Sequence, residues 1–150
     1  HQANVPMLGI CWGHQFLAQT FGGRVVDMGD HEIGYRTVKR YGEDPLFAGV
    51  PDSFTAFETH SDRVAELPSG AVELARNEYG IQAFRLGSSY GVQFHPEYDR
   101  ETAEWVVGNK ELSPERLADI EATFTEQNVS EAEIAKAVFD NFLTIVVAHQ

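Results

Sequence analysis

The chain has 150 residues, 43% of them apolar and 11% aromatic, and its 23 acidic side chains against 11 Lys and Arg give a net charge of −12. This length fits one domain that buries about 70% of its unfolded surface, and the apolar content excludes a disordered chain. The charge argues against a nucleic-acid backbone or an anionic membrane as partner, because both would repel it. No run of residues predicts a membrane span or a signal peptide, and the single cysteine indicates a reducing, cytoplasmic compartment.

The first half of the chain alternates strand and helix patterns. Val5–Ile10 predicts a buried parallel strand, and helical spacing from Gly13 ends at the pair Gly22-Gly23. Val25-Val26 and Glu32–Arg40 predict two strands separated by a turn at Gly29-Asp30. A short helical turn or loop at 44–50 follows. Four more strands are predicted at 54–57, 71–75, 81–86 and 90–94, the last three joined by tight turns as a hairpin meander.

The second half is predicted to be helical after residue 99. One helix spans 100–107, and a second spans 113–127 with Pro114 in its first turn. Ser130 and Glu133 form a capping box that opens a third helix over 131–147. Its apolar face is formed by Ile134, Val138, Phe142, Ile145 and Val146. Strand, helix, strands and a closing helix predict an α/β fold with an incomplete sheet.

The stretch GICWGHQ at 9–15 carries the first chemical motif. A glycine on either side of Cys11, set between strand and helix, is the layout of a nucleophile elbow with cysteine in place of serine. The helix N-terminus then favours the thiolate of Cys11, and the backbone N–H of Trp12 lies where an oxyanion could form. Alone, the motif also fits a small buried cysteine with no chemical role.

The stretch GVQFHPE at 91–97 carries the second motif. In an extended segment His95 and Glu97 point to the same side, and Pro96 keeps His95 out of the helical region. A base with its own carboxylate predicts a triad in which Cys11 attacks, His95 moves the proton and Glu97 fixes the His95 tautomer. In isolation this motif would favour a solvated strand end. The two motifs together favour catalysis.

These two stretches resemble the class I (triad) glutamine amidotransferases, nearest to the amidotransferase part of GMP synthase and its stand-alone relatives. The weaker FETHSDRVAELP stretch at 57–68 resembles that family's substrate-side loop. The resemblance implies a three-layer, flavodoxin-like fold with an open, mostly parallel sheet and flanking helices. It implies hydrolysis of the glutamine side-chain amide through a thioester on Cys11, with Gln15, His60, Ser61 and Asp62 near the substrate. An exposed polar turn is the alternative reading of 60–62.

The family's other oxyanion N–H comes from a glycine-rich loop upstream of the nucleophile strand, and nothing before His1 can supply it. We therefore expect residues 1–150 to be the C-terminal portion of a single amidotransferase domain. The family implies that the ammonia passes to a synthetase subunit or domain. The extra segment after Glu97 departs from a GMP synthase ending, so the acceptor is either that of GMP synthesis or an unidentified one.

Two other function classes stay open. One is a γ-glutamyl hydrolase that uses the same triad, and the other is a non-catalytic regulatory or interaction domain with an incomplete oxyanion hole. No cofactor is predicted. Cys11 and His14 have a ligand-like spacing, but a structural zinc site needs four convergent ligands, so no metal site is predicted either.

Overall fold

The computed structural model describes residues 5–148, in which six strands form one sheet in the order β1-β6-β5-β4-β2-β3. The strands are β1 Leu8–Ile10, β2 Arg24–Arg40, β3 Ser53–Glu66, β4 Val72–Asn77, β5 Gly80–Leu86 and β6 Ser89–Val92. The α-helices are α1 Trp12–Thr20, α2 Arg100–Gly108, α3 Pro114–Glu121, α4 Glu126–Ala132 and α5 Ala137–Ala148. Two short 3₁₀ helices are η1 Pro45–Phe47 and η2 Glu133–Lys136.

The sheet is mixed, and within the described residues its one parallel pairing joins β1 to β6. β2 pairs antiparallel with β3 and β4, and β4–β5–β6 form the predicted hairpin meander. The tight turns that join β4, β5 and β6 allow only antiparallel neighbours, since parallel strands need a crossover of a dozen or more residues. The α/β class with flanking helices is confirmed, whereas the described strands themselves do not form a mostly parallel sheet.

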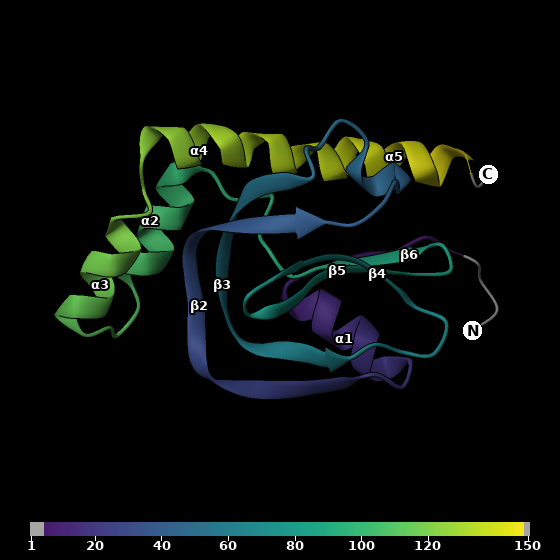
Figure 1. The fold of residues 1–150 in the computed structure, drawn as a ribbon, viewed down its shortest axis with the longest axis horizontal. Coiled ribbons are helices and arrows are strands. Elements are labelled where there is room, and N and C mark those ends of the chain that lie inside the picture. The colour runs from purple at the N-terminus through teal and green to yellow at the C-terminus, as the bar shows by residue number, and fades with distance from the viewer. Residues whose placement is uncertain (1–4, 149–150) are drawn as a thin grey trace.

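β2 is one long strand, so the predicted turn at Gly29-Asp30 is wrong. Both halves of β2 pair with the continuous strand β3, with Asp27 opposite Asp62 and Glu32 opposite His60. The extra residues on β2 form a bulge, in which Gly29 has φ 67° and its N–H donates to Asp27. Figure 1 shows β2 and β3 bending together around one side of the molecule. Glycine and aspartate here permit a bend within a paired strand.

The helices after residue 99 differ from the prediction in two places. α2 and the start of α3 are confirmed, with Ser113 as N-cap and Pro114 in the first turn. The predicted helix 113–127 is two helices, because Thr125 caps a new helix by accepting from the Asn128 N–H. The predicted capping box at Ser130 is therefore wrong, since Ser130 lies inside α4.

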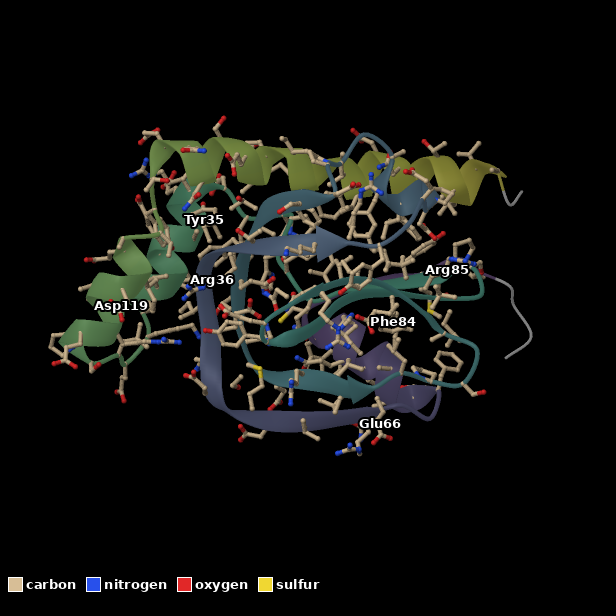
Figure 2. All side chains as sticks on the ribbon, viewed as in Figure 1. Tyr35, Arg36, Glu66, Phe84, Arg85 and Asp119 are labelled. Carbon is tan, nitrogen blue, oxygen red and sulfur yellow. The ribbon has the colours of Figure 1, made fainter. Side chains whose placement is uncertain are left out.

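Helices cover both faces of the sheet, with α1 on one side and the α4–α5 run on the other (Figure 1). Leu17 of α1 and Phe84 of β5 belong to one core cluster on the first side. Figure 2 labels Phe84 near α1. Val138 and Ile145 of α5 pack with Val92 and the rest of the larger core on the other. The 3₁₀ helix η2 shifts the phase of the closing helix, which leaves Ile134 exposed although it was predicted to face the sheet.

α2, α3 and α4 lie beyond the bend of β2 and β3, and they cover a third core cluster there (Figure 1). Tyr35 and Phe57 supply the aromatic rings of that cluster, and Phe124 packs edge-on against both. The described helices include none that is both long and apolar enough to span a membrane.

Candidate active site

Cys11 lies in the sharp turn between β1 and α1. Its φ is +51° and its ψ −102°, and it is the one non-glycine residue with positive φ among residues 5–148. A side chain at positive φ is strained, as in the nucleophile elbow. Gly9 allows the helix to start so close to the strand, because a Cβ on Gly9 would lie 2.5 Å from backbone atoms of Gly13. The predicted elbow geometry is therefore present.

The thiol of Cys11 points toward β3 and the segment after β6. Gln93 Nε2 donates to Cys11 Sγ at 3.6 Å, and the thiol donates to the backbone carbonyl of Thr59 at 3.8 Å. The Cys11 N–H bonds to Val92 O at 2.8 Å, which continues the pairing of β1 with β6. Cys11 and residues 93–95 therefore follow two neighbouring parallel strands at the same, carboxyl edge, where α/β sheets place their sites.

Burial raises the pKa of Cys11 from its ordinary 9.0 to about 11, helped by the nearby carboxylates of Glu58 and Glu97. The Trp12 backbone N–H and the Gln93 amide act in the opposite direction and are outweighed. The prediction that the helix N-terminus makes Cys11 a ready thiolate is therefore wrong for this conformation. Desolvation destabilises the buried thiolate by more free energy than the N-terminus of the helix contributes to stabilising it.

His95 and Glu97 contact each other through a turn, whereas an extended segment was predicted. His95 Nδ1 lies 2.6 Å from Glu97 Oε1, and the Tyr98 N–H reaches His95 O at 3.4 Å across the turn. Pro96 takes the second position of that turn, which its fixed φ favours. The His95 N–H bonds to Phe57 O at 2.9 Å, and the Tyr98 ring stacks on the imidazole at 4.3 Å. These contacts fix the imidazole of His95 against the carboxylate of Glu97.

The residues assigned by resemblance to the substrate side divide between the surface and the interior. Residues 60–62 lie within β3, so the alternative of an exposed polar turn is wrong. Asp62 is exposed and shares a surface groove with Gln15, Trp12 and Phe16. Ser61 is half-buried, and His60 is buried with its ring turned to the interior. The Gln15 amide donates to Asp62 O at 2.8 Å and to Gln93 Oε1 at 3.2 Å.

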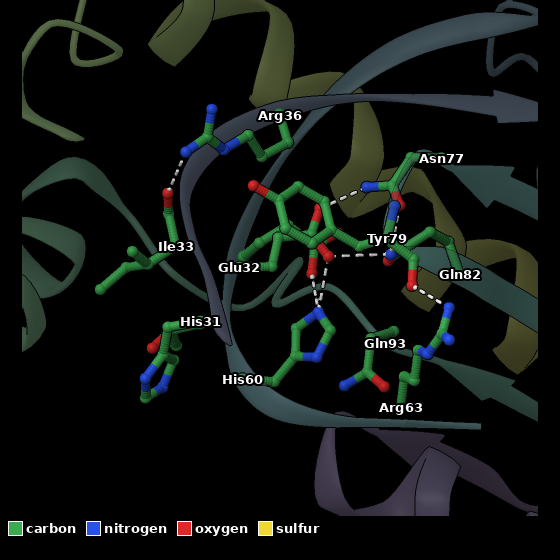
Figure 3. A network of polar contacts seen from close by, with 12 residues as sticks. His31, Glu32, Ile33, Arg36, His60, Arg63, Asn77, Tyr79, Gln82 and Gln93 are labelled. Carbon is green, nitrogen blue, oxygen red and sulfur yellow. Dashed lines mark hydrogen bonds and ion pairs between the residues drawn. The ribbon is translucent and has the colours of Figure 1, made fainter. Parts of the chain in front are cut away.

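A buried charged cluster beside the site went unpredicted (Figure 3). His60 Nε2 lies 2.7 Å from Glu32 Oε2 and 3.4 Å from Glu58 Oε2, and both glutamates are fully buried. Asn77 Nδ2 donates to Glu32 Oε1, and Gln82 Nε2 donates to Glu32 Oε2 at 3.0 Å. Glu58 and His60 stand two apart in one strand and so share a face, a signal that was readable. Glu32 joins them only through the register of β2 with β3.

The cluster shifts the pKa values of its own members. Burial and the charge of Glu32 raise the pKa of Glu58 from 4.5 to about 8. Burial alone would lower the pKa of His60, but hydrogen bonds to Glu32 and Glu58 outweigh it and raise that pKa to about 10. At neutral pH the cluster therefore contains a protonated His60 beside a largely protonated Glu58.

Glu32, Glu58 and His60 are also the set in the described chain that could hold a metal ion, since their ligand atoms lie within 4.8 Å of one another. Each has a ligand type that suits Zn²⁺. However, the carboxylate of Glu32 already accepts N–H groups from Asn77, Gln82 and His60. Amide N–H donors aimed at a carboxylate satisfy it as an anion without a metal.

The comparison with protein families gives one match over most of the chain. The model of the class-I glutamine amidotransferases matches residues 1–110. This range contains both GICWGHQ and GVQFHPE and ends just after α2.

Similar proteins include GMP synthases and a solved amidotransferase. The glutamine-hydrolyzing GMP synthase of Thermosipho africanus is 42% identical over 99 residues, which are 64% of this chain and 19% of that protein. One subunit of the glutamine-hydrolyzing GMP synthase of Thermococcus kodakarensis is 43% identical over 97 residues, 63% of this chain and 52% of that subunit. The crystal structure of a Thermotoga maritima glutamine amidotransferase superposes with a TM-score of 0.79 at 29% identity, covering 95% of this chain and 63% of that one. The chain thus spans from a fifth to under two thirds of these proteins.

Proposed function

The chain belongs to the class-I glutamine amidotransferase family, and from this premise we propose that it hydrolyses the side-chain amide of glutamine to glutamate and ammonia. The observation that carries the proposal is the strained Cys11 elbow at the carboxyl edge of β1, with the bonded pair His95 and Glu97 on the segment that follows the neighbouring strand β6. A nucleophile, a base and an orienting carboxylate are the parts that covalent acyl transfer requires.

In the proposed reaction the Cys11 thiol transfers its proton to His95 as sulfur attacks the amide carbon. Glu97 bonds to Nδ1 of His95, so the other ring nitrogen is free to exchange that proton. The N–H of Trp12, the first residue of α1, supports the oxyanion. His95 then protonates the departing ammonia. In the second half of the reaction His95 takes a proton from a water molecule that attacks the thioester carbonyl, and it returns that proton to sulfur as glutamate leaves, which restores the thiol.

The high pKa of Cys11 bears on when the proton leaves sulfur. With a pKa near 11, raised chiefly by burial, the sulfur is a neutral thiol at physiological pH. In the proposal the proton therefore moves to His95 as sulfur attacks the substrate. A resting neutral thiol also limits reaction of the site with stray electrophiles.

For the substrate we propose the groove that Gln15 and Asp62 share beside Trp12 and Phe16. Gln15 and Asp62 offer polar groups for the amino-acid end of glutamine, and Ser61 is placed beside them in β3. The ring of His60 faces the interior, so we propose that His60 acts on the site indirectly.

Residues 1–150 are further proposed to be the C-terminal portion of one amidotransferase domain, supported by the 63% of the Thermotoga maritima chain that they cover. The ammonia would pass to a synthetase partner of the GMP synthase kind or to another acceptor. The similarity to the Thermococcus kodakarensis GMP synthase, in which the matching protein is a separate subunit, supports the first.

The test is glutamate release from glutamine by the natural protein that carries this sequence, compared with its Cys11→Ala and Glu97→Gln variants. A glutamine-analogue electrophile with mass spectrometry reports in parallel whether Cys11 is labelled. Release that Cys11→Ala abolishes and Glu97→Gln slows supports the proposal. Release from larger γ-glutamyl compounds but not from glutamine would indicate a γ-glutamyl hydrolase. An unlabelled, well-folded protein would indicate a non-catalytic domain.

A further inference from the structure

A continuous chain of hydrogen bonds joins the buried charged cluster to the nucleophile. It starts at Glu32 and passes through both ring nitrogens of His60, since Nε2 contacts Glu32 at 2.7 Å and Nδ1 contacts Asp62 O at 2.7 Å. Asp62 O also accepts from Gln15 Nε2 at 2.8 Å. Gln15 Nε2 reaches Gln93 Oε1 at 3.2 Å, and Gln93 Nε2 reaches Cys11 Sγ at 3.6 Å.

Each bond in this chain determines the orientation of the next group. A backbone carbonyl can only accept, so His60 Nδ1 and Gln15 Nε2 must both donate to Asp62 O. Gln15 Nε2 has a second hydrogen, which Gln93 Oε1 accepts. Once its oxygen is engaged in this way, Gln93 presents its N–H to the sulfur. The raised pKa of His60 agrees with donation from both ring nitrogens.

Burial makes this arrangement stable. His60, Gln15 and Gln93 are each less than a tenth exposed, and Glu32 and Gln93 are fully buried. Water therefore does not compete for these donors and acceptors, and a reversed amide would leave buried polar atoms unpaired. These hydrogen bonds run from β2 and β3 to α1 and to the segment after β6. They therefore link β3, α1 and that segment around the sulfur.

We propose that His60, held by Glu32, is a positioning residue for the nucleophile, and that it acts through Asp62 O, Gln15 and Gln93 to direct the Gln93 N–H at Cys11. This inference rests on the proposed function, in which Cys11 is the nucleophile. The Gln93 N–H stabilises the negative charge that sulfur gains as its proton leaves. His60 Nε2 also lies 3.4 Å from Oε2 of Glu58, one of the two glutamates whose charge raises the pKa of Cys11 when it is ionised.

The test measures the reactivity of Cys11 with iodoacetamide, which needs no glutamine turnover. The chain has one cysteine, so the label reports Cys11 alone. Gln15→Met removes both donated bonds at similar volume. Gln15→Glu replaces the donating Nε2 by a carboxylate oxygen that faces Gln93 Oε1, so the Gln93 amide must turn its N–H toward residue 15 and away from the sulfur. Gln127→Met is the matched control, because Gln127 is an exposed helical glutamine that bonds only within α4.

A hydrogen bond to a thiolate lowers the pKa of the thiol by about one unit, so its loss raises that pKa and reduces the thiolate fraction. The thiolate of a less acidic thiol is somewhat more nucleophilic, which offsets part of this loss. We therefore expect alkylation at pH 8 to slow about three- to tenfold in Gln15→Met and further in Gln15→Glu, with the rate restored at higher pH. Gln127→Met should match the wild type. Wild-type alkylation in both folded Gln15 variants would overturn the proposal.

Two substitutions at His60 separate positioning from packing. The amide nitrogen of Asn lies near the place of Nδ1, and that of the longer Gln reaches toward Nε2. His60→Asn keeps the bond to Asp62 O and should alkylate close to the wild-type rate, whereas His60→Gln keeps the contact with Glu32 and should slow. The reverse order would show that His60 only fills the cluster. If neither variant folds, the Gln15 pair decides.

Two further measurements distinguish this proposal from the function on which it rests. Slowed alkylation in the Gln15 variants of a protein that releases no glutamate would support the hydrogen-bond chain and reject the glutaminase activity. Glutamate release by the wild type together with unchanged alkylation in the Gln15 variants would support the glutaminase activity and reject the hydrogen-bond chain. Stoichiometric Zn²⁺ in the purified protein would also overturn the proposal, because Glu32 and His60 would then be ligands.

Discussion

Replacing Glu58 by Gln keeps the size of the side chain and removes its ionisable group, so it isolates the cost of a buried charge. Glu58 is fully buried, and burial together with Glu32 raises its pKa from 4.5 to about 8. Between these two values the folded chain holds a proton that the unfolded chain has released. The free energy of unfolding therefore falls as the pH rises through this window. The difference of about 3.5 units corresponds to at most about 5 kcal/mol above pH 8.

We expect Glu58→Gln to leave the free energy of unfolding nearly unchanged at pH 5, where Glu58 is already protonated in the folded state. At pH 8.5 the variant should be more stable than the wild type by several kcal/mol, because only the wild type must ionise a buried carboxyl. Urea unfolding followed by tryptophan fluorescence measures both values. Glu78→Gln, in the exposed turn between β4 and β5, is the control and should show no such difference.

The same variant has a second expected effect at the active site. Glu58 is the larger of the two carboxylate contributions that raise the pKa of Cys11, after burial itself. Glu58→Gln should therefore lower that pKa and speed alkylation of Cys11 at pH 8.5. A stability difference between variant and wild type that is equal at pH 5 and pH 8.5 would refute this account of the buried charge, whatever happens at the thiol.

Three other predictions concern backbone contact, the thiol and a helix cap. Gly91→Ala places a Cβ 2.6 Å from Phe84 Cε1 and should cost about 1–3 kcal/mol in urea unfolding, whereas Gly108→Ala meets open space and should not destabilise; equal stability of the two variants would contradict the packing. Alkylation of wild-type Cys11 should rise about tenfold per pH unit from pH 7 to 9, because its pKa lies near 11, and a plateau below pH 9 would show a more acidic thiol. Thr125→Ala should cost about 1 kcal/mol of stability by removing the N-cap of α4, and an unchanged urea midpoint would count against a separate helix there.

Local patterns predicted the elements that depend on neighbours in sequence. The strand before Cys11, the helix after it and the hairpin meander were all predicted, because glycine pairs, tight turns and apolar spacing act within a few residues. Ser113 and Pro114 marked the start of α3 for the same reason. Both motifs of the candidate triad were visible, since each one occupies a single short stretch of the chain.

The errors arose where a distant partner overrides a local signal. Gly29-Asp30 has the composition of a turn, but β3 pairs with β2 on both sides of it. Ser130 and Glu133 have the spacing of a capping box, but Thr125 starts the helix earlier. The residue before it, Phe124, packs on Tyr35 and Phe57. A composition signal is worth a fraction of a kcal/mol to about one, and a whole ladder of strand pairing outweighs it.

The sequence alone indicated the proposed class of chemistry, because the cysteine elbow and the His-Pro-Glu motif are each encoded in a few consecutive residues, although the turn at His-Pro-Glu was not predicted. The tertiary structure decided the electrostatics of that chemistry. Glu32, Glu58 and His60 meet only when the register of β2 with β3 is formed, and the path from His60 to Cys11 needs α1 and the segment after β6 in place. A pKa depends on burial and on charges from any part of the chain, so the neutral thiol of Cys11 could be recognised only in the folded molecule.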